Sequence, residues 1–64
     1  MDSNWHKRFK LWRKTRNLTQ EELAHKIGVC WATVNRWEAG KKSPSRMAIE
    51  QIRKAGGPVP GGRE

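Results

Sequence analysis

A close succession of helix-start and helix-stop signals between Thr19 and Gly40 constrains the fold most strongly. Thr19 followed by Glu22 is a capping box, in which the threonine hydroxyl accepts from an amide three residues on and the glutamate reaches back. We therefore expect a helix of about two turns to begin at Gln20 and to end at Gly28, since glycine adopts a left-handed conformation without a steric penalty. The apolar stripe of this helix is formed by Leu23, Ala24 and Ile27.

A second short helix is predicted between Gly28 and Gly40. The spacing i, i+4, i+7 of Cys30, Val34 and Trp37 aims one face of this helix at the core. Cys30 stands at its cap, where sulfur is a weaker acceptor than the hydroxyl of Ser or Thr, and we expect it to pack against the core. The residues predicted to point away are Ala32, Asn35 and Arg36.

Two further helices are predicted on either side of this pair. The helical spacing of Trp5, Phe9 and Trp12 indicates an amphipathic helix over about residues 4 to 15, with a basic outer face. Ser43 and Pro44 are read as a cap followed by proline at the first helical position, and the helix then continues up to Gly56. Its apolar positions are Ala48, Ile49, Ile52 and Ala55.

The domain organisation follows from these helices. We expect an all-α domain of four helices over residues 1–56, followed by a flexible, disordered tail over residues 57–64, where glycine and proline cannot sustain a helix. A chain of 64 residues has too small a core to enclose a catalytic cavity as well. His6 and His25 have no nucleophile to pair with, so we expect no enzyme.

The net charge and the number of cysteines limit the kinds of partner that this chain can bind. The chain carries 14 Lys and Arg against 6 Asp and Glu, a net charge of +8, which attracts polyanions and makes nucleic acid the natural partner. The one Cys and two His match no zinc-ligand spacing, so we expect no metal, no cofactor and no small-molecule ligand. Val29–Ala32 is the only apolar run longer than three residues, which argues against a membrane partner. Because no apolar stretch has the length of a signal peptide, we expect a cytoplasmic protein.

A further set of residues, at fixed spacings along the chain, indicates the type of domain more specifically. It comprises Leu18, Thr19, Gln20, Glu21, Glu22, Leu23, Ala24, Ile27, Gly28, Val29, Val34, Arg36, Trp37, Glu38, Gly40 and Lys41. Over about residues 9 to 44 the chain resembles the helix-turn-helix of the phage repressor and Cro family, also called the XRE family. The resemblance implies a compact fold like that of lambda repressor, a duplex DNA operator as partner, and a prokaryotic, phage or plasmid-encoded protein that acts in the cytoplasm or nucleoid.

The same resemblance implies base contacts from the second short helix. Trp31, Ala32, Thr33 and Arg36 match positions from which family members touch base edges, and the planar fork of Arg36 suits guanine O6 and N7. Asn35 could bond adenine in the same bidentate way, although its position is more often peripheral. Two alternatives stay open: Arg36 neutralises a phosphate, and Trp31 contacts a protein instead of DNA.

Phosphate contacts are implied at two places. Gln20 matches a phosphate-contacting glutamine of the family, and it stands at a helix N-terminus, which is suited to anions. The alternative is that Gln20 is an ordinary solvated glutamine. Lys41, Lys42 and Ser43 follow the recognition helix where the family's loop lies against the sugar-phosphate backbone. These contacts would fix register without reading sequence.

Other matching positions are structural. Arg13 and Glu38 occupy positions that pair in repressor-type domains as a partly buried salt bridge. Trp12 and Trp37 are predicted to face inward and not to act as base-stacking platforms. Leu23 and Val34 are core positions. Asn17 replaces the usual glycine before Leu18 and should accept a left-handed conformation.

The sequence therefore predicts a sequence-specific transcriptional regulator, either a repressor or an antitoxin-type autoregulator, bound as a possible homodimer to a palindromic site. Two other classes remain open. A protein-bridging coactivator would use the same fold with Trp31 on its outer face. A non-specific RNA or nucleoid binder would depend on the +8 charge alone and would lose affinity steeply with salt.

Overall fold

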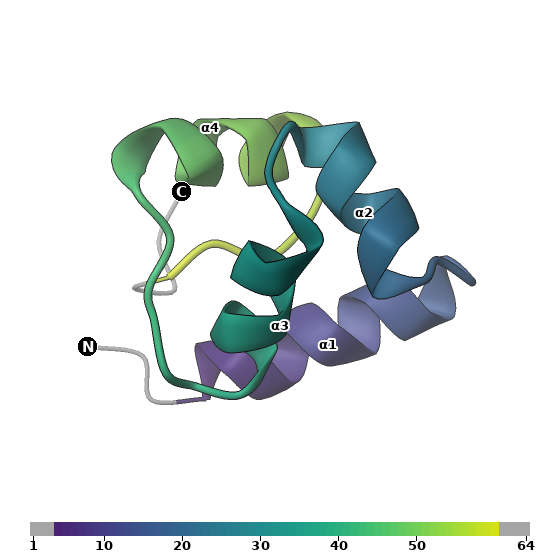
Figure 1. The fold of residues 1–64 in the computed structure, drawn as a ribbon, viewed down its shortest axis with the longest axis horizontal. Helices are drawn as coiled ribbons and strands as arrows, with labels where there is room; N and C mark the ends of the chain where they lie inside the picture. The colour runs from purple at the N-terminus through teal and green to yellow at the C-terminus, as the bar shows by residue number, and fades with distance from the viewer. Residues whose placement is uncertain (1–3, 61–64) are drawn as a thin grey trace.

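The computed structural model describes residues 4–60, and these form four α-helices and no strand. The helices are α1 (Trp5–Thr15), α2 (Gln20–Ile27), α3 (Trp31–Glu38) and α4 (Arg46–Lys54). In Figure 1, α1 and α4 lie at opposite sides of the molecule, with α2 and α3 between them. The predicted all-α, four-helix fold is confirmed. No helix within the described range has the length and apolar character needed to cross a membrane.

The local signals around α2 act as predicted. The Thr19 hydroxyl accepts from the Glu22 amide at 3.0 Å, and the Thr19 amide donates to the Glu22 carboxylate at 2.8 Å, which closes the capping box. Gly28 ends the helix with a φ of +81°, and Asn17 has a φ of +58°. Both left-handed residues lie where the sequence predicts them, because each allows a sharp change of chain direction between helices.

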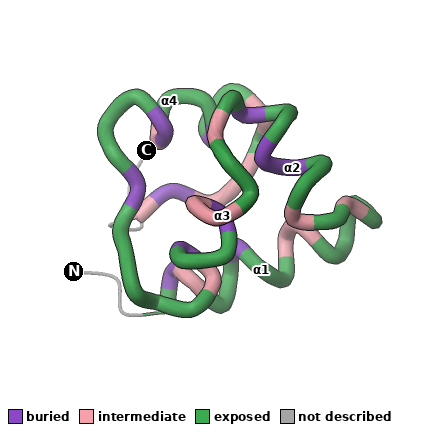
Figure 2. The backbone as a smooth tube through the Cα atoms, in the orientation of Figure 1, coloured by how far each residue is buried: buried purple, intermediate pink, exposed green. Residues whose placement is uncertain are grey.

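The core is aromatic and receives side chains from every helix. The Trp5 and Phe9 rings stack with centroids 4.9 Å apart, and Trp37 meets Phe9 edge to face at 5.7 Å. Figure 2 shows that buried positions occur on all four helices. Trp12 is only partly buried, and the Arg16 guanidinium lies 5.7 Å from the centre of its ring. The fully or nearly buried helical residues are Trp5, Phe9, Leu23, Ala24, Ile27, Val34, Trp37, Ala48 and Ile52.

Two predictions at helix starts are wrong. Ser45, and not Ser43, caps α4, and its hydroxyl accepts from the Ala48 amide at 3.2 Å. Pro44 is buried before the helix begins, so it anchors the preceding loop and does not occupy the first turn. Cys30 is exposed, although it was expected to pack on the core. Its backbone is extended at the cap position, so the helical spacing that aims residues inward does not apply to it.

Residues 57–60, which were expected to belong to the tail, pack against the core. The Gly57 amide donates to the Ile52 carbonyl at 2.9 Å, and the Trp5 indole donates to the Pro58 carbonyl at 2.9 Å. Val59 is buried. A Cβ at Gly57 would lie 2.9 Å from Ile52 Cγ2, so glycine here permits a close approach. Residues 61–64 of the predicted tail lie outside the described residues.

Candidate nucleic-acid interface

One face of α3 is exposed. Asn35 and Arg36 are exposed and Trp31 is 51% exposed, while Val34 and Trp37 on the opposite face are buried. Ala32 and Thr33 are partly buried. In Figure 1, α3 lies on the near side of the molecule with no other helix in front of it. The structure thus places all the predicted base-contact residues on one short helix that can be approached from outside.

The turn between α2 and α3 holds this face in place. Gly28 in its left-handed conformation reverses the chain, and the Val29 amide donates to the Ala24 carbonyl at 2.9 Å. Val29 also packs against the hydrophobic core. Because the turn is bonded to α2 and fixed by an apolar side chain, the start of α3 has a defined direction relative to α2.

A charged pair joins α1 to the end of α3. Arg13 Nε lies 2.7 Å from Glu38 Oε2, and Arg13 Nη2 donates to Glu38 Oε1 at 3.2 Å. The side chains are 11% and 4% exposed. Arg13 Nη1 also donates to the Leu18 carbonyl at 2.7 Å. The salt bridge implied by the family resemblance is therefore present, and it also ties down the loop before α2.

Gln20 is partly buried and bonded within the protein. Its Nε2 donates to Glu38 Oε1 at 2.9 Å, and its Oε1 accepts from Asn35 Nδ2 at 3.4 Å. The sequence placed Gln20 near phosphate and Asn35 near bases, but it did not reveal that the two side chains meet. No signal in the sequence gives this contact, because it depends on how α2 crosses α3.

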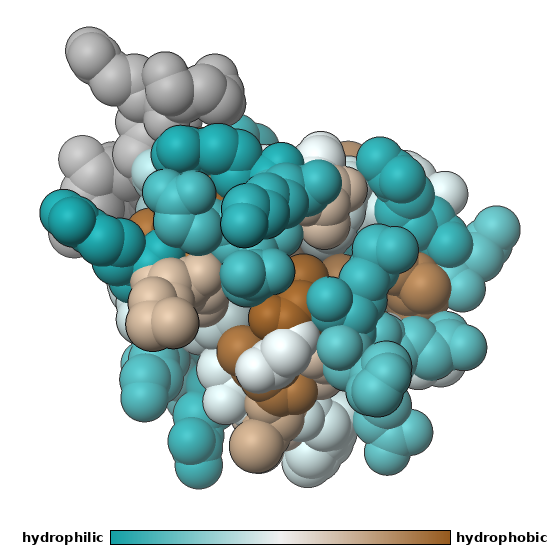
Figure 3. Space-filling model, turned by 90° about the horizontal axis from the view of Figure 1, so that it is seen from above, coloured by the Kyte–Doolittle hydropathy of each residue, from teal (hydrophilic) through white to brown (hydrophobic). Residues whose placement is uncertain are grey.

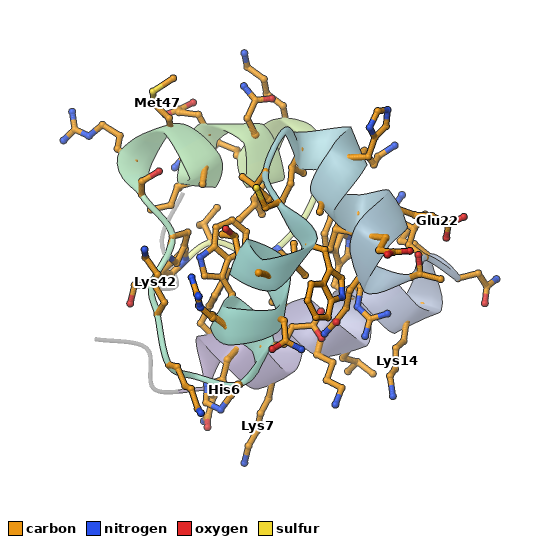
Figure 4. The ribbon with its side chains drawn as sticks, viewed as in Figure 1. His6, Lys7, Lys14, Glu22, Lys42 and Met47 are labelled. Atoms are coloured by element: carbon orange, nitrogen blue, oxygen red, sulfur yellow. The ribbon has the colours of Figure 1, made fainter. Side chains whose placement is uncertain are left out.

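The loop after α3 carries the other predicted phosphate contacts. Lys41, Lys42 and Ser43 are all exposed. The loop begins at a fixed point, since Gly40 has a φ of +76° and the Lys41 amide donates to the Arg36 carbonyl at 3.0 Å. Figure 4 shows Lys42 on this connection between α3 and α4. Neither lysine has an ion-pair partner within residues 4–60.

The outer side of α1 adds positive charge. Lys7, Lys10 and Lys14 are exposed, and the labelled Lys7 and Lys14 in Figure 4 extend away from the body of the molecule. Within residues 4–60 none of these lysines forms an ion pair, whereas Glu38 is held by Arg13 and Glu50 lies 3.7 Å from Arg53. The outer side of α1 and the loop after α3 therefore each present positive charge that is suited to a polyanion.

A shallow pocket of about 370 Å³ lies elsewhere, between the end of α2 and the start of α4. Its apolar lining includes Ile27, Val29 and Ala48, beside the 79% exposed Met47. Figure 3, which views the molecule from the α4 side, shows apolar surface surrounded by hydrophilic side chains. None of the predicted DNA-contact residues lines this pocket. The described residues contain no group of three or more potential metal ligands.

Comparisons with known proteins point to the same part of the chain. A family model described as helix-turn-helix matches residues 9–60. A protein of Methanothermobacter thermautotrophicus named as an uncharacterized HTH-type transcriptional regulator is 44% identical over 43 residues, which cover 67% of this chain. The match spans 62% of that relative, less than two thirds of its length. No solved structure is significantly similar.

Proposed function

Because the chain belongs to the helix-turn-helix family, whose model covers residues 9–60, we propose that it binds duplex DNA with α3 in the major groove and regulates transcription. The observation that carries the proposal is the outer face of α3, on which Trp31, Asn35 and Arg36 are exposed while Val34 and Trp37 anchor the helix. A major groove about 12 Å wide admits a single α-helix in this way.

In this proposal Arg36 reads guanine. Its exposed guanidinium lies one turn after Ala32, whose small side chain leaves room for close approach to the base edges. A bidentate bond to guanine O6 and N7 contributes about 1–3 kcal/mol of discrimination. Ala32, Thr33 and Trp31 contact thymine methyl groups or sugar edges beside it.

Phosphate contacts by Lys41, Lys42 and Ser43 fix the register of α3 in the groove. Their exposure and the absence of ion-pair partners within the described chain support this role. Gln20 contributes at the other predicted phosphate position, at the start of α2. Because counterions are released, this part of the affinity falls as salt rises.

More specifically, we propose a repressor that binds as two copies to a palindromic operator. If the protein is an autoregulator, this operator is that of its own gene. The described domain measures 27 × 22 × 21 Å. Half-sites one helical turn apart are separated by about 34–36 Å, so two copies fit side by side on one face of DNA without overlap. The relative named as a transcriptional regulator agrees with a regulatory role.

The experiment is selection of duplexes from a random library at near-physiological salt, followed by sequencing. The proposal predicts a defined motif with two-fold symmetry, and single-stranded DNA or RNA of equal length should compete poorly. A chain that binds every duplex and RNA equally, with affinity that only fades with salt, would be a general nucleic-acid binder. Exposed Trp31 favours a second candidate, a protein-bridging module, which predicts no motif and little DNA affinity.

A further inference from the structure

We propose that Glu38, acting through Gln20, fixes the orientation of the Asn35 amide so that α3 selects adenine over guanine at the position that Asn35 contacts. Asn35 is then a specificity-determining residue, and Glu38 and Gln20 are positioning residues. The inference rests on the proposed binding of duplex DNA by α3. It is carried by a continuous chain of hydrogen bonds from Glu38 to Gln20 to Asn35.

The first step is set by Glu38. An ionised carboxylate has only acceptors, and this one forms a salt bridge with Arg13 at 2.7 Å, with a side chain 4% exposed. A neighbouring amide can therefore meet it only with its NH₂ group. Gln20 does so, with Nε2 2.9 Å from Glu38 Oε1. The Gln20 amide has one permitted orientation in this position.

The second step passes that orientation to α3. With its NH₂ group committed to Glu38, Gln20 presents Oε1 to Asn35, and Asn35 meets this acceptor with Nδ2 at 3.4 Å. Asn35 is exposed, so its second N–H and its Oδ1 remain available to a ligand. The side chain thus offers a donor and an acceptor whose positions are no longer interchangeable.

The third step is the match to a base. Adenine presents an acceptor at N7 and a donor at N6 in the major groove, which complements the N–H and Oδ1 of Asn35. Guanine presents two acceptors, N7 and O6, and would bring O6 against Oδ1. An unrestrained asparagine could avoid this repulsion by aiming both N–H groups at N7 and O6, but in Asn35 one of the two donors is engaged by Gln20 Oε1.

The test compares binding motifs of the wild type, Asn35→Ala and Gln20→Lys. A lysine ammonium has only donors, so it still pairs with Glu38 but presents a donor to Asn35 and reverses its amide. We expect the wild type to prefer adenine over guanine by about 5- to 150-fold at the base pair where Asn35→Ala has no preference. Gln20→Lys should remove that preference, so that the ratio of the two affinities falls to about one. It should change nothing further in an Asn35→Ala background.

Gln51→Lys on α4 is the matched control, since it makes the same charge change at an exposed glutamine away from α3. If Gln20→Lys unfolds, Gln20→Met, which cannot hydrogen-bond to either neighbour, should lower the preference in the same direction by a smaller factor. An unchanged adenine preference in a Gln20 variant that still binds overturns the inference alone. A wild type without any motif overturns the proposed function as well.

Discussion

At the scale of single residues, the Glu38 side chain connects three of the four helices. Its carboxylate bonds Arg13 on α1 and Gln20 on α2, while its own helix carries the exposed face. The sequence predicted the pairing with Arg13 because matching family positions pair, but it held no sign of the contact with Gln20. Removing a nearly buried partner leaves a desolvated charge behind, so the fold depends on this residue.

Glu38→Ala should therefore lower the free energy of unfolding by about 3–5 kcal/mol, because Arg13 keeps its charge without a carboxylate partner. In a domain of this size that loss lowers the melting temperature by at least about 12 °C. Thermal unfolding followed by circular dichroism measures it. The matched control is Glu50→Ala, whose exposed pair with Arg53 at 3.7 Å should contribute under about 1 kcal/mol. Equal losses in the two variants would contradict a structural role for Glu38.

At the scale of the helices, local chemistry predicted some boundaries and not others. The limits of α2 followed from the Thr19 capping box and Gly28, because both signals act within a few residues of the chain. The start of α4 did not follow, since two serines flank Pro44 and burial of the proline decides between them. Burial depends on the packing of distant helices, which no local pattern contains.

The cap of α3 offers a prediction at this scale. Cys30 has the extended backbone of a cap residue but makes no side-chain cap hydrogen bond. Cys30→Ser supplies a hydroxyl at that position and should raise stability by about 1 kcal/mol, whereas Thr19→Ala at the cap of α2 should lower it by about the same amount. Urea denaturation of both variants gives the values. A Cys30→Ser variant less stable than the wild type would show that the thiol makes a contact that the hydroxyl cannot replace.

At the scale of the whole molecule, the contacts between distant segments were the least predictable. Residues 57–60 have the composition of a tail, yet Val59 is buried and Pro58 accepts from the Trp5 indole. Glycine at position 57 is read from sequence as a helix breaker, and in the fold it permits close approach to Ile52. The exposed face of α3 was predictable, because helical periodicity alone separates its buried and free sides.

The charge of the molecule gives a prediction for its affinity. The double substitution Lys41→Gln and Lys42→Gln should reduce the slope of log affinity against log salt by about 0.9 for each phosphate that is no longer neutralised. It should lower the affinity for every DNA sequence by the same factor. Binding isotherms at several salt concentrations measure the slope. Lys26→Gln with Lys54→Gln removes the same charge from α2 and α4 and serves as the control. Equal slope changes in both pairs would indicate general attraction without a defined role for the loop.

Base reading by α3 is tested by measuring the affinity of Arg36→Ala for the selected duplex and for versions of that duplex substituted at each base pair in turn. We predict that the variant loses discrimination at one or two adjacent positions, by about 1–3 kcal/mol, and keeps the wild-type preferences elsewhere. A uniform loss across all positions, or no loss, would contradict the claim that α3 reads the bases of duplex DNA.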